Sequence, residues 1–204
     1  VITMDNLNTA SNMLALFGNN TELTIYAQYT EVGNFVVIYS AVGADEETIP
    51  TDNTQYNIAE TSIIKIPNQE PKKLGYTFEG WKTGTDDTVY KYGTQNDTYT
   101  VPNDISGAIT FIAQWSINEY KITYELNGGI NAENAPVSYT IETDTITLPV
   151  PTKDGYNFEG WYTDAAFENA VAAIAKGSVG DMVLYAKWSE KDMAVYKINS
   201  YEKG

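Results

Sequence analysis

Gly75-Tyr76-Thr77-Phe78-Glu79-Gly80-Trp81 returns 80 residues later as Gly155-Tyr156-Asn157-Phe158-Glu159-Gly160-Trp161, with one position changed. A second motif follows each copy, first as Phe111-Ile112-Ala113-Gln114-Trp115 and then as Leu184-Tyr185-Ala186-Lys187-Trp188. It occurs once more near the start, as Ile25-Tyr26-Ala27-Gln28-Tyr29. Motifs that recur in this way indicate a chain built from copies of one supersecondary module.

The repeats divide the chain into four parts. Residues 1–31 are predicted to be the carboxy-terminal half of a partial repeat, and residues 32–117 a first full repeat with an enlarged interval at 82–104. Residues 118–190 are the second full repeat, and residues 191–204 begin a further strand or a tail. Because a half-module cannot bury its own apolar face, we expect residues 1–31 to pack on the next module. The chain is interpreted as a piece of a longer protein.

Each full repeat is predicted to begin with a half-buried strand. Apolar side chains alternate over residues 120–126 of the second repeat, and 35–39 is the matching strand of the first. Asn127-Gly128-Gly129 then supplies residues that tolerate positive φ, as a tight turn requires. A second strand is predicted at 137–148 and, in the first repeat, at 56–66. Prolines end both.

The heptamer itself predicts a strand with a bulge. Its Tyr and Phe share one face, whereas strict alternation would turn the Trp to the opposite side. A β-bulge at Gly80 and at Gly160 would return each Trp to the core face. The closing strands place Phe111 and Leu184 inward, with Tyr185 among the side chains that point outward.

The two repeats are predicted to differ between the heptamer and the closing strand. In the second repeat, Asp164 is placed to cap a short helix that carries Phe167, Val171 and Ile174 at helical spacing and ends before Gly177. In the first repeat, the 82–104 interval is rich in Gly, Thr and Asp and is predicted to be an extended loop or a hairpin.

Composition excludes several classes of function. The chain has 12 lysines and no arginine against 27 acidic residues, a net charge of −15, so neither nucleic acid nor an anionic membrane surface is an expected partner. Cys and His are absent, which removes thiolate and imidazole metal sites, Cys nucleophiles and the Ser-His-Asp triad. No apolar run is long enough to span a membrane, and no cofactor is expected.

The combined motifs resemble a known family. A Tyr-rich strand ending in Asn127-Gly128-Gly129, the Pro151-Thr152 turn, the stretch 155–163 and the closing Leu184 to Trp188 are similar to the Listeria–Bacteroides repeat, the B-repeat module of internalin-type and other bacterial surface proteins. Residues 118–190 match nearly end to end. The first repeat lacks the Asn-Gly-Gly turn and has Lys82 after its Trp.

The resemblance implies an α+β fold made of tandem small β-grasp-like (ubiquitin-like) modules, each a mixed sheet with a short helix and β-dominated. It also implies an extracellular position at the bacterial cell surface, attached to the envelope or secreted. The family has no agreed catalytic residues, so none is assigned. Adjacent repeat modules are the expected partners.

The recurring aromatic residues could either bind sugars or fill the core of each module. Sugars stack on exposed aromatic faces, but a module of this size needs large rings to fill its core, and core positions must recur for the fold to recur. We therefore assign the following residues to the core: Tyr76, Phe78, Gly80, Trp81, Trp115, Tyr156, Phe158, Gly160, Trp161 and Trp188.

Candidate binding residues are sought where the copies differ. A candidate binding surface is predicted at Tyr90, Tyr92 and Tyr99 in the enlarged interval and at Tyr185 on the closing strand. Stacking between successive modules, which would also use Tyr26 and Ile112, is the preferred alternative.

The acidic side chains are predicted to have structural roles and not to form a metal or catalytic site. Asp45-Glu46-Glu47 and Asp86-Asp87 lack the alternate spacing of a calcium loop, so a solvated face is favoured over a weak calcium site. Glu79 and Glu159 lie in separate repeats and cannot flank one glycosidic bond.

These patterns predict a non-catalytic spacer, stalk or adhesion module. It would contact a host or matrix protein or a glycan. The alternative is a dedicated glycan- or peptide-binding module that uses exposed tyrosines or a sheet edge.

Overall fold

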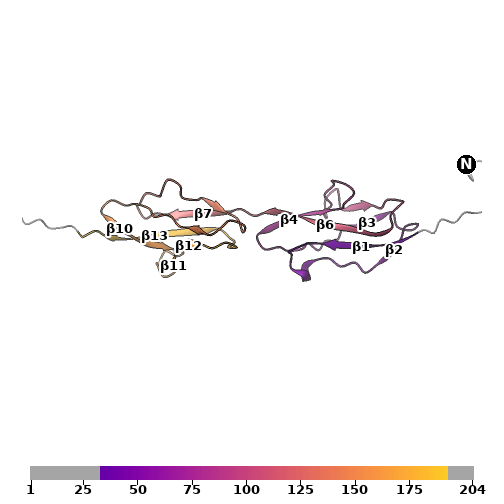
Figure 1. Ribbon diagram of the computed structural model, residues 1–204, viewed down its shortest axis with the longest axis horizontal. Helices are drawn as coiled ribbons and strands as arrows, with labels where there is room; N and C mark the ends of the chain where they lie inside the picture. The colour runs from indigo at the N-terminus through magenta and orange to yellow at the C-terminus, as the bar shows by residue number, and fades with distance from the viewer. Residues whose placement is uncertain (1–32, 193–204) are drawn as a thin grey trace, which may run out of the picture. The chain divides into compact units, whose positions relative to one another are not determined.

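A computed structural model describes residues 33–192 of the chain (Figure 1). The partial repeat predicted at 1–31, with its closing motif and Tyr26, lies outside the described residues, as does nearly all of the strand or tail predicted at 191–204. We call 32–117 the first repeat and 118–190 the second.

The first repeat contains a mixed four-stranded sheet in the order β2-β1-β6-β4. The central strands β1 and β6 are parallel, whereas the pairs β1–β2 and β4–β6 are antiparallel. Two short strands, β3 and β5, pair separately. The bounds are β1 Asn34–Ser40, β2 Gln55–Asn57, β3 Ile63–Lys65, β4 Tyr76–Lys82, β5 Thr98–Thr100 and β6 Gly107–Ile117.

The second repeat contains a mixed five-stranded sheet in the order β11-β10-β13-β7-β8. Its central strands β7 and β13 are again parallel, and β9 pairs separately with β12. The bounds are β7 Tyr120–Glu125, β8 Ser138–Tyr139, β9 Ile146–Thr147, β10 Tyr156–Tyr162, β11 Ala170–Val171, β12 Ala173–Ile174 and β13 Met182–Glu190. A β-dominated fold with mixed sheets is therefore confirmed.

The predicted helix after Asp164 is wrong. Over residues 33–192 the helical structure is a single 3₁₀ turn, η2, at Glu46–Thr48. The Asp164 carboxylate accepts the N–H groups of Glu168 and Asn169, at 3.1 and 2.8 Å, and so closes a turn instead of capping a helix. Phe167 lies in the left-handed region, with φ of 57°, which interrupts any helix. Residues 170–174 then pair as the edge strands β11 and β12.

The second strand predicted in each repeat is shorter than expected. Residues 137–148 form only β8 and β9, with a loop between them, and residues 56–66 contribute to β2 and β3 in the same way. The 82–104 interval was predicted to be an extended loop or a hairpin, and its first part forms a hairpin with the heptamer strand. The backbone groups of Trp81 and Tyr90 exchange two hydrogen bonds of 2.8 Å.

The bulge predicted in the heptamer is confirmed in both repeats. The register of β4 on β6 shifts between Phe78 and Gly80, and that of β10 on β13 shifts between Phe158 and Gly160. The two glycines have φ of 140° and 135°. The shift puts the Trp on the same side of the strand as the Phe. The ring centres of Phe78 and Trp81 lie 5.0 Å apart, in an edge-to-face contact.

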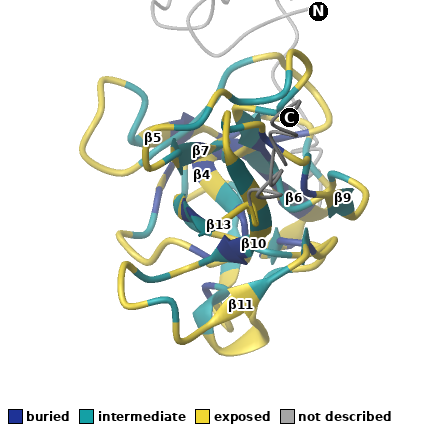
Figure 2. Ribbon diagram, turned by 90° about the vertical axis from the view of Figure 1, so that its left-hand side faces the viewer, coloured by how far each residue is buried: buried dark blue, intermediate teal, exposed yellow. Residues whose placement is uncertain are grey.

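Each repeat has its own apolar core. Buried positions lie mainly in the strands, where they alternate with exposed ones, and the outer loops are mostly exposed or half-buried (Figure 2). The largest fully buried side chains are Trp81, Phe35, Phe111 and Leu184. In the second repeat, the turn predicted at Asn127-Gly128-Gly129 is confirmed: Asn127 and Gly128 have φ of 49° and 84°, and the Gly129 N–H donates to Leu126 O at 2.9 Å.

Candidate functional site

The recurring aromatic residues pack against one another. Phe78, Trp81 and Trp161 are buried, and the other rings assigned to the core are half-buried. Cross-strand edge contacts join Phe78 to Trp115 at 5.6 Å and the equivalent pair of the second repeat, Phe158 and Trp188, at 5.4 Å. Rings engaged on one another in this way leave little flat face for a sugar.

The tyrosines of the first-repeat interval do not form a common surface. Tyr92 is 56% exposed, whereas Tyr90 is half-buried and packs on Phe111. Tyr99 requires a correction, because it is 4% exposed and belongs to the first core. It contacts Tyr90 and Phe111 in edge geometry and cannot reach a ligand in the folded chain.

The acidic residues are engaged locally. Glu79 accepts a hydrogen bond from Ser116 on the neighbouring strand, as Glu159 does from Ser189. Asp86 accepts the Thr88 N–H at 2.8 Å. Among residues 33–192 no group of three or more His, Cys, Asp or Glu side chains is placed to hold a metal ion.

A first candidate site lies where the two repeats meet. β6 ends at Ile117 and β7 begins at Tyr120, so only two residues connect the sheets. One of them, Asn118, donates its N–H to Gly75 O at 2.9 Å and accepts the Thr77 hydroxyl at 2.6 Å. Gly75 and Thr77, at the start of the first heptamer, are therefore hydrogen-bonded to the segment that connects the two repeats.

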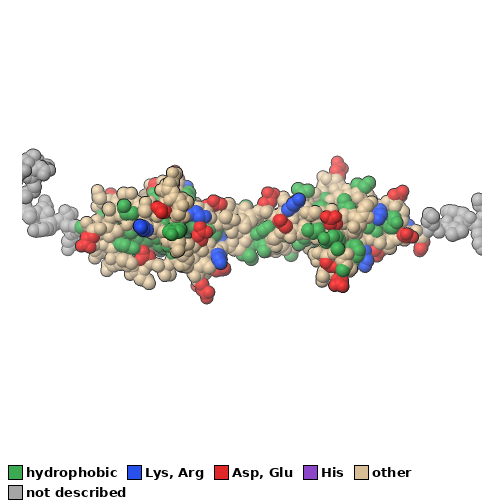
Figure 3. All heavy atoms as spheres, turned by 180° about the vertical axis from the view of Figure 1, so that it is seen from behind, with side chains coloured by type: hydrophobic (Ala, Val, Ile, Leu, Met, Phe, Trp, Pro, Cys, Tyr) green, Lys and Arg blue, Asp and Glu red, His purple; other side chains and the backbone are tan. Residues whose placement is uncertain are grey.

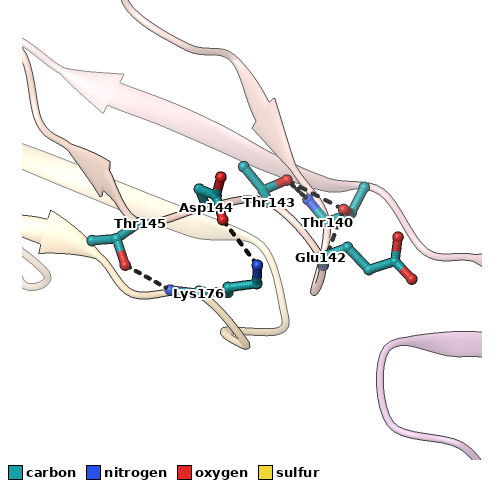
Figure 4. A network of polar contacts seen from close by, with 6 residues as sticks. All are labelled: Thr140, Glu142, Thr143, Asp144, Thr145 and Lys176. Carbon is teal, nitrogen blue, oxygen red and sulfur yellow. Dashed lines mark hydrogen bonds and ion pairs between the residues drawn. The ribbon is translucent and has the colours of Figure 1, made fainter.

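The loop after β8 reaches the same place. Figure 4 shows how residues 140–145 are braced: Thr140 and Thr143 bond to each other, and Asp144 pairs with Lys176 at 2.9 Å. This loop presents Glu142, which accepts the Tyr76 hydroxyl. That hydrogen bond raises the pKa of Tyr76.

Ile141 of the same loop lies against Gly75. A Cβ on Gly75 would lie 2.7 Å from the Ile141 side chain, a distance too short for any side chain at this position. Gly155, its counterpart in the second heptamer, has the same φ of 77° and nothing within 4 Å of such a Cβ. We call Gly75, Tyr76, Asn118, Ile141 and Glu142 the junction.

A second candidate site is a pocket of about 520 Å³ on the second repeat. We call it the aromatic pocket. It is lined by Asn127, Lys153, Tyr156, Ala165, Phe167, Tyr185, Ala186, Lys187 and Trp188.

Its two lysines lie over aromatic rings. Lys153 Nζ lies 4.2 Å from the centre of the Tyr156 ring, and Lys187 Nζ lies 5.1 Å from that of Tyr162 and 5.7 Å from that of Phe167. Of the predicted binding tyrosines, only Tyr185 lies here.

Elsewhere the surface is mixed. In Figure 3, acidic and basic side chains are scattered over the visible face, with small apolar groups between them. No helix in the described part of the chain is long and apolar enough to cross a membrane.

Comparison with known proteins decides the family. The sequence profile of the Listeria-Bacteroides repeat domain matches the chain twice, at residues 35–114 and 120–187. The chain belongs to this repeat family. The matches include both heptamers, and they extend into the closing motifs as far as Gln114 and Lys187. The resemblance stated from the sequence is therefore confirmed.

The similar proteins are much longer than this chain. A Gly-rich membrane protein of Evansella cellulosilytica is 32% identical over 84% of this chain and 19% of its own length. Another membrane protein of the same organism is 30% identical over 89% of this chain and 25% of its own. Internalin H of Listeria monocytogenes is 33% identical over 68% of this chain and 24% of its own. The chain therefore spans about a fifth to a quarter of these relatives.

Sequence reasoning missed most of both sites. Ile141 and Glu142 belong to no recurring motif. Their role is seen only in the fold, where they contact Gly75 and Tyr76 of the first heptamer. Lys153, Phe167 and Lys187 were not singled out as binding residues. The signal for Lys187 was present, because the closing motif reads Gln114 in the first repeat and Lys187 in the second.

Proposed function

We propose that this chain is a non-catalytic spacer region of a bacterial cell-surface or secreted protein. Its two repeats would act as tandem β-grasp-like modules. The observation that carries the proposal is the junction, where a two-residue connection, hydrogen bonds and an apolar contact tie one repeat to the next.

The junction restricts the connection in two ways. Asn118 is bonded to the first heptamer through its backbone and its side chain, which removes freedom from the linker. Ile141 and Glu142 add contacts from a loop 66 residues away from Tyr76. Repeats that contact only their neighbours, through short stiff connections, are suited to hold other domains at a distance.

The strand order supports the β-grasp-like assignment. In both repeats the first and last strands lie parallel at the centre of the sheet, with the second strand and the heptamer strand on either side. The short strands β11 and β12 occupy the stretch where a helix was expected. Each repeat would thus be a β-grasp-like sheet that has almost no helix.

The surface location rests on the relatives. Two are described as membrane proteins and one is an internalin, and this chain matches only part of each. A repeat region that fills a quarter or less of a longer chain is suited to present the remainder. We propose the outside of the bacterial cell as the place where it does so.

Small-angle X-ray scattering tests the spacer role. We expect the chain to scatter as an elongated particle whose maximum dimension is unchanged between low and high salt, because the junction contacts are mostly apolar and hydrogen-bonded. A compact, globular profile would argue against a spacer. So would a length that changes with salt.

A further inference from the structure

The outward face of the closing strand differs between the two repeats. Lys187 and Tyr185 of β13 occupy the same register positions as Gln114 and Ile112 of β6, relative to the heptamer strand. The inward positions that alternate with them are apolar in both repeats. The fold is thus formed with Gln and Ile at these places, and it does not require Lys and Tyr there.

Phe167 lies in a conformation that its side chain disfavours. Its φ of 57° is in the left-handed region, where bulky residues are outliers and glycine is preferred. Asn127 is the other non-glycine residue with such a φ among residues 33–192, and both line the aromatic pocket. The positive φ of Asn127 is explained by the tight turn in which it lies, since Asn tolerates this conformation. The turn at Phe167 could be formed by glycine without strain, so the turn alone does not account for a Phe there. Strained residues of this kind gather at functional sites.

The left-handed backbone of Phe167 determines where its ring lies. It holds the Phe167 ring 5.5 Å from Tyr162 in edge contact and near the Lys187 ammonium group. The Asp164 carboxylate fixes this turn by accepting the N–H groups of Glu168 and Asn169, and those bonds lower the pKa of Asp164. The ring and the ammonium group are therefore positioned before any ligand arrives.

Charge around the pocket is opposite to that of the chain. The lining includes two lysines and no carboxylate, although the net charge of the chain is −15. Lys153 has a structural role, since it donates to Asn127 O at 2.8 Å and its place over Tyr156 is repeated by Lys73 over Tyr76. Lys187 has no ion pair within the described residues. Its charge is available to a ligand.

We infer that the aromatic pocket binds an acidic carbohydrate, an oligosaccharide of uronic-acid units. The Lys187 ammonium group would pair with a sugar carboxylate, while Tyr185 and Phe167 would contact the apolar face of the ring. An open pocket of about 520 Å³ lined by aromatic side chains, with one charged group to set orientation, suits such a ligand.

Other anions fit less well. A chain of net charge −15 repels a densely charged polymer such as a nucleic acid or a polysulfate, because many cations would be needed to hold it. An acidic peptide offers the carboxylate but no rigid apolar face for the rings. A uronic-acid oligosaccharide combines one carboxylate per unit with a flat apolar side.

Isothermal titration of the whole chain with tetragalacturonate tests the inference. We expect saturable binding that is at least about tenfold weaker for the uncharged methyl ester, since a charge-assisted contact is lost. Poly-glutamate serves as the acidic-peptide probe. Absence of saturable binding to tetragalacturonate would overturn the inference, and so would equal or tighter binding of poly-glutamate.

The first repeat supplies the matched substitutions. Lys187→Gln and Tyr185→Ile introduce the residues that the same fold carries at the same positions, so the variants should fold while binding weakens about tenfold or more. Lys65→Gln, on an exposed strand position of the first repeat, makes the same charge change and should leave affinity unaltered. Unchanged affinity in Lys187→Gln would overturn the inference.

Phe167→Gly separates binding from folding. Because glycine relieves the left-handed backbone, we expect thermal stability to be kept or raised while affinity for tetragalacturonate falls. Retained affinity in this variant would remove the ring from the site. None of these residues belongs to the junction, so failure of this inference leaves the spacer proposal standing.

Discussion

Trp81 and Trp161 occupy equivalent positions in the two repeats, but within residues 33–192 only the indole N–H of Trp161 has a hydrogen-bond partner. Trp161 Nε1 donates to Pro149 O at 2.7 Å. Trp81 is fully buried, and its Nε1 has no hydrogen-bond partner among the described residues. A buried donor without a partner costs free energy, so the first repeat carries a local defect that the second repeat lacks.

Replacing each Trp by Phe should therefore have unequal effects. Both changes remove the same volume, but only Trp161→Phe also breaks a hydrogen bond, so its loss of unfolding free energy should be larger by about 1 kcal/mol. Amide exchange of the closing strands, β6 for one repeat and β13 for the other, measures the two effects separately. Equal losses would show that the Trp81 N–H is satisfied.

At the residue scale, the sequence predicts inward positions better than exposed ones. The heptamer rings were predicted to be core because they recur, and Trp81, Phe78 and Trp161 are indeed buried. Tyr99 was assigned to a binding surface because its interval differs between the two repeats, but β5 pairs with β3 and turns the ring into the core. A long-range pairing of three-residue strands has no signal in a single sequence.

The heptamer strand is the element on which both sheets depend. Its bulge lets Phe and Trp share a face, and it requires a backbone conformation open mainly to glycine. The space around the two glycines differs. A Cβ on Gly80 would lie 2.5 Å from Val89 Cγ1 and 2.8 Å from Tyr90 O, whereas on Gly160 the nearest atom would be Tyr162 Cε2 at 3.9 Å.

Alanine at the two bulges should separate backbone strain from crowding. Gly160→Ala is expected to cost about 1–3 kcal/mol, the typical cost of a strained φ. Gly80→Ala should cost more, because the added methyl group also meets the hairpin at Val89 and Tyr90. Denaturant unfolding of the two variants measures this. A Gly160→Ala variant as stable as the unchanged chain would mean that the bulge relaxes without glycine.

At the element scale, sequence reasoning was wrong about the helix for a physical reason. Phe167, Val171 and Ile174 have helical spacing, but the same residues also satisfy a turn followed by two short edge strands. The Asp164 side chain decides between them, since its carboxylate bonds to Glu168 and Asn169 rather than to the first turn of a helix. Asp favours caps and turns alike, so its presence alone could not settle the choice.

At the scale of the whole described chain, the junction is the feature that the spacer proposal needs. Gly75 and Gly155 are equivalent glycines with the same φ of 77°, but only Gly75 faces the other repeat. Gly75→Ala should therefore disturb the junction as well as the local backbone, whereas Gly155→Ala should disturb the backbone alone. The pair forms an internal control for the contact with Ile141.

Double electron–electron resonance across the junction tests the spacer proposal most directly. The chain has no native cysteine, so spin labels at Asn103→Cys and Asn134→Cys, two exposed positions in different repeats, report a single distance. We predict a narrow distance distribution that broadens with Gly75→Ala and stays narrow with Gly155→Ala. A broad distribution in the chain without either alanine would contradict the proposal, because it would mean that the two repeats move freely about Asn118.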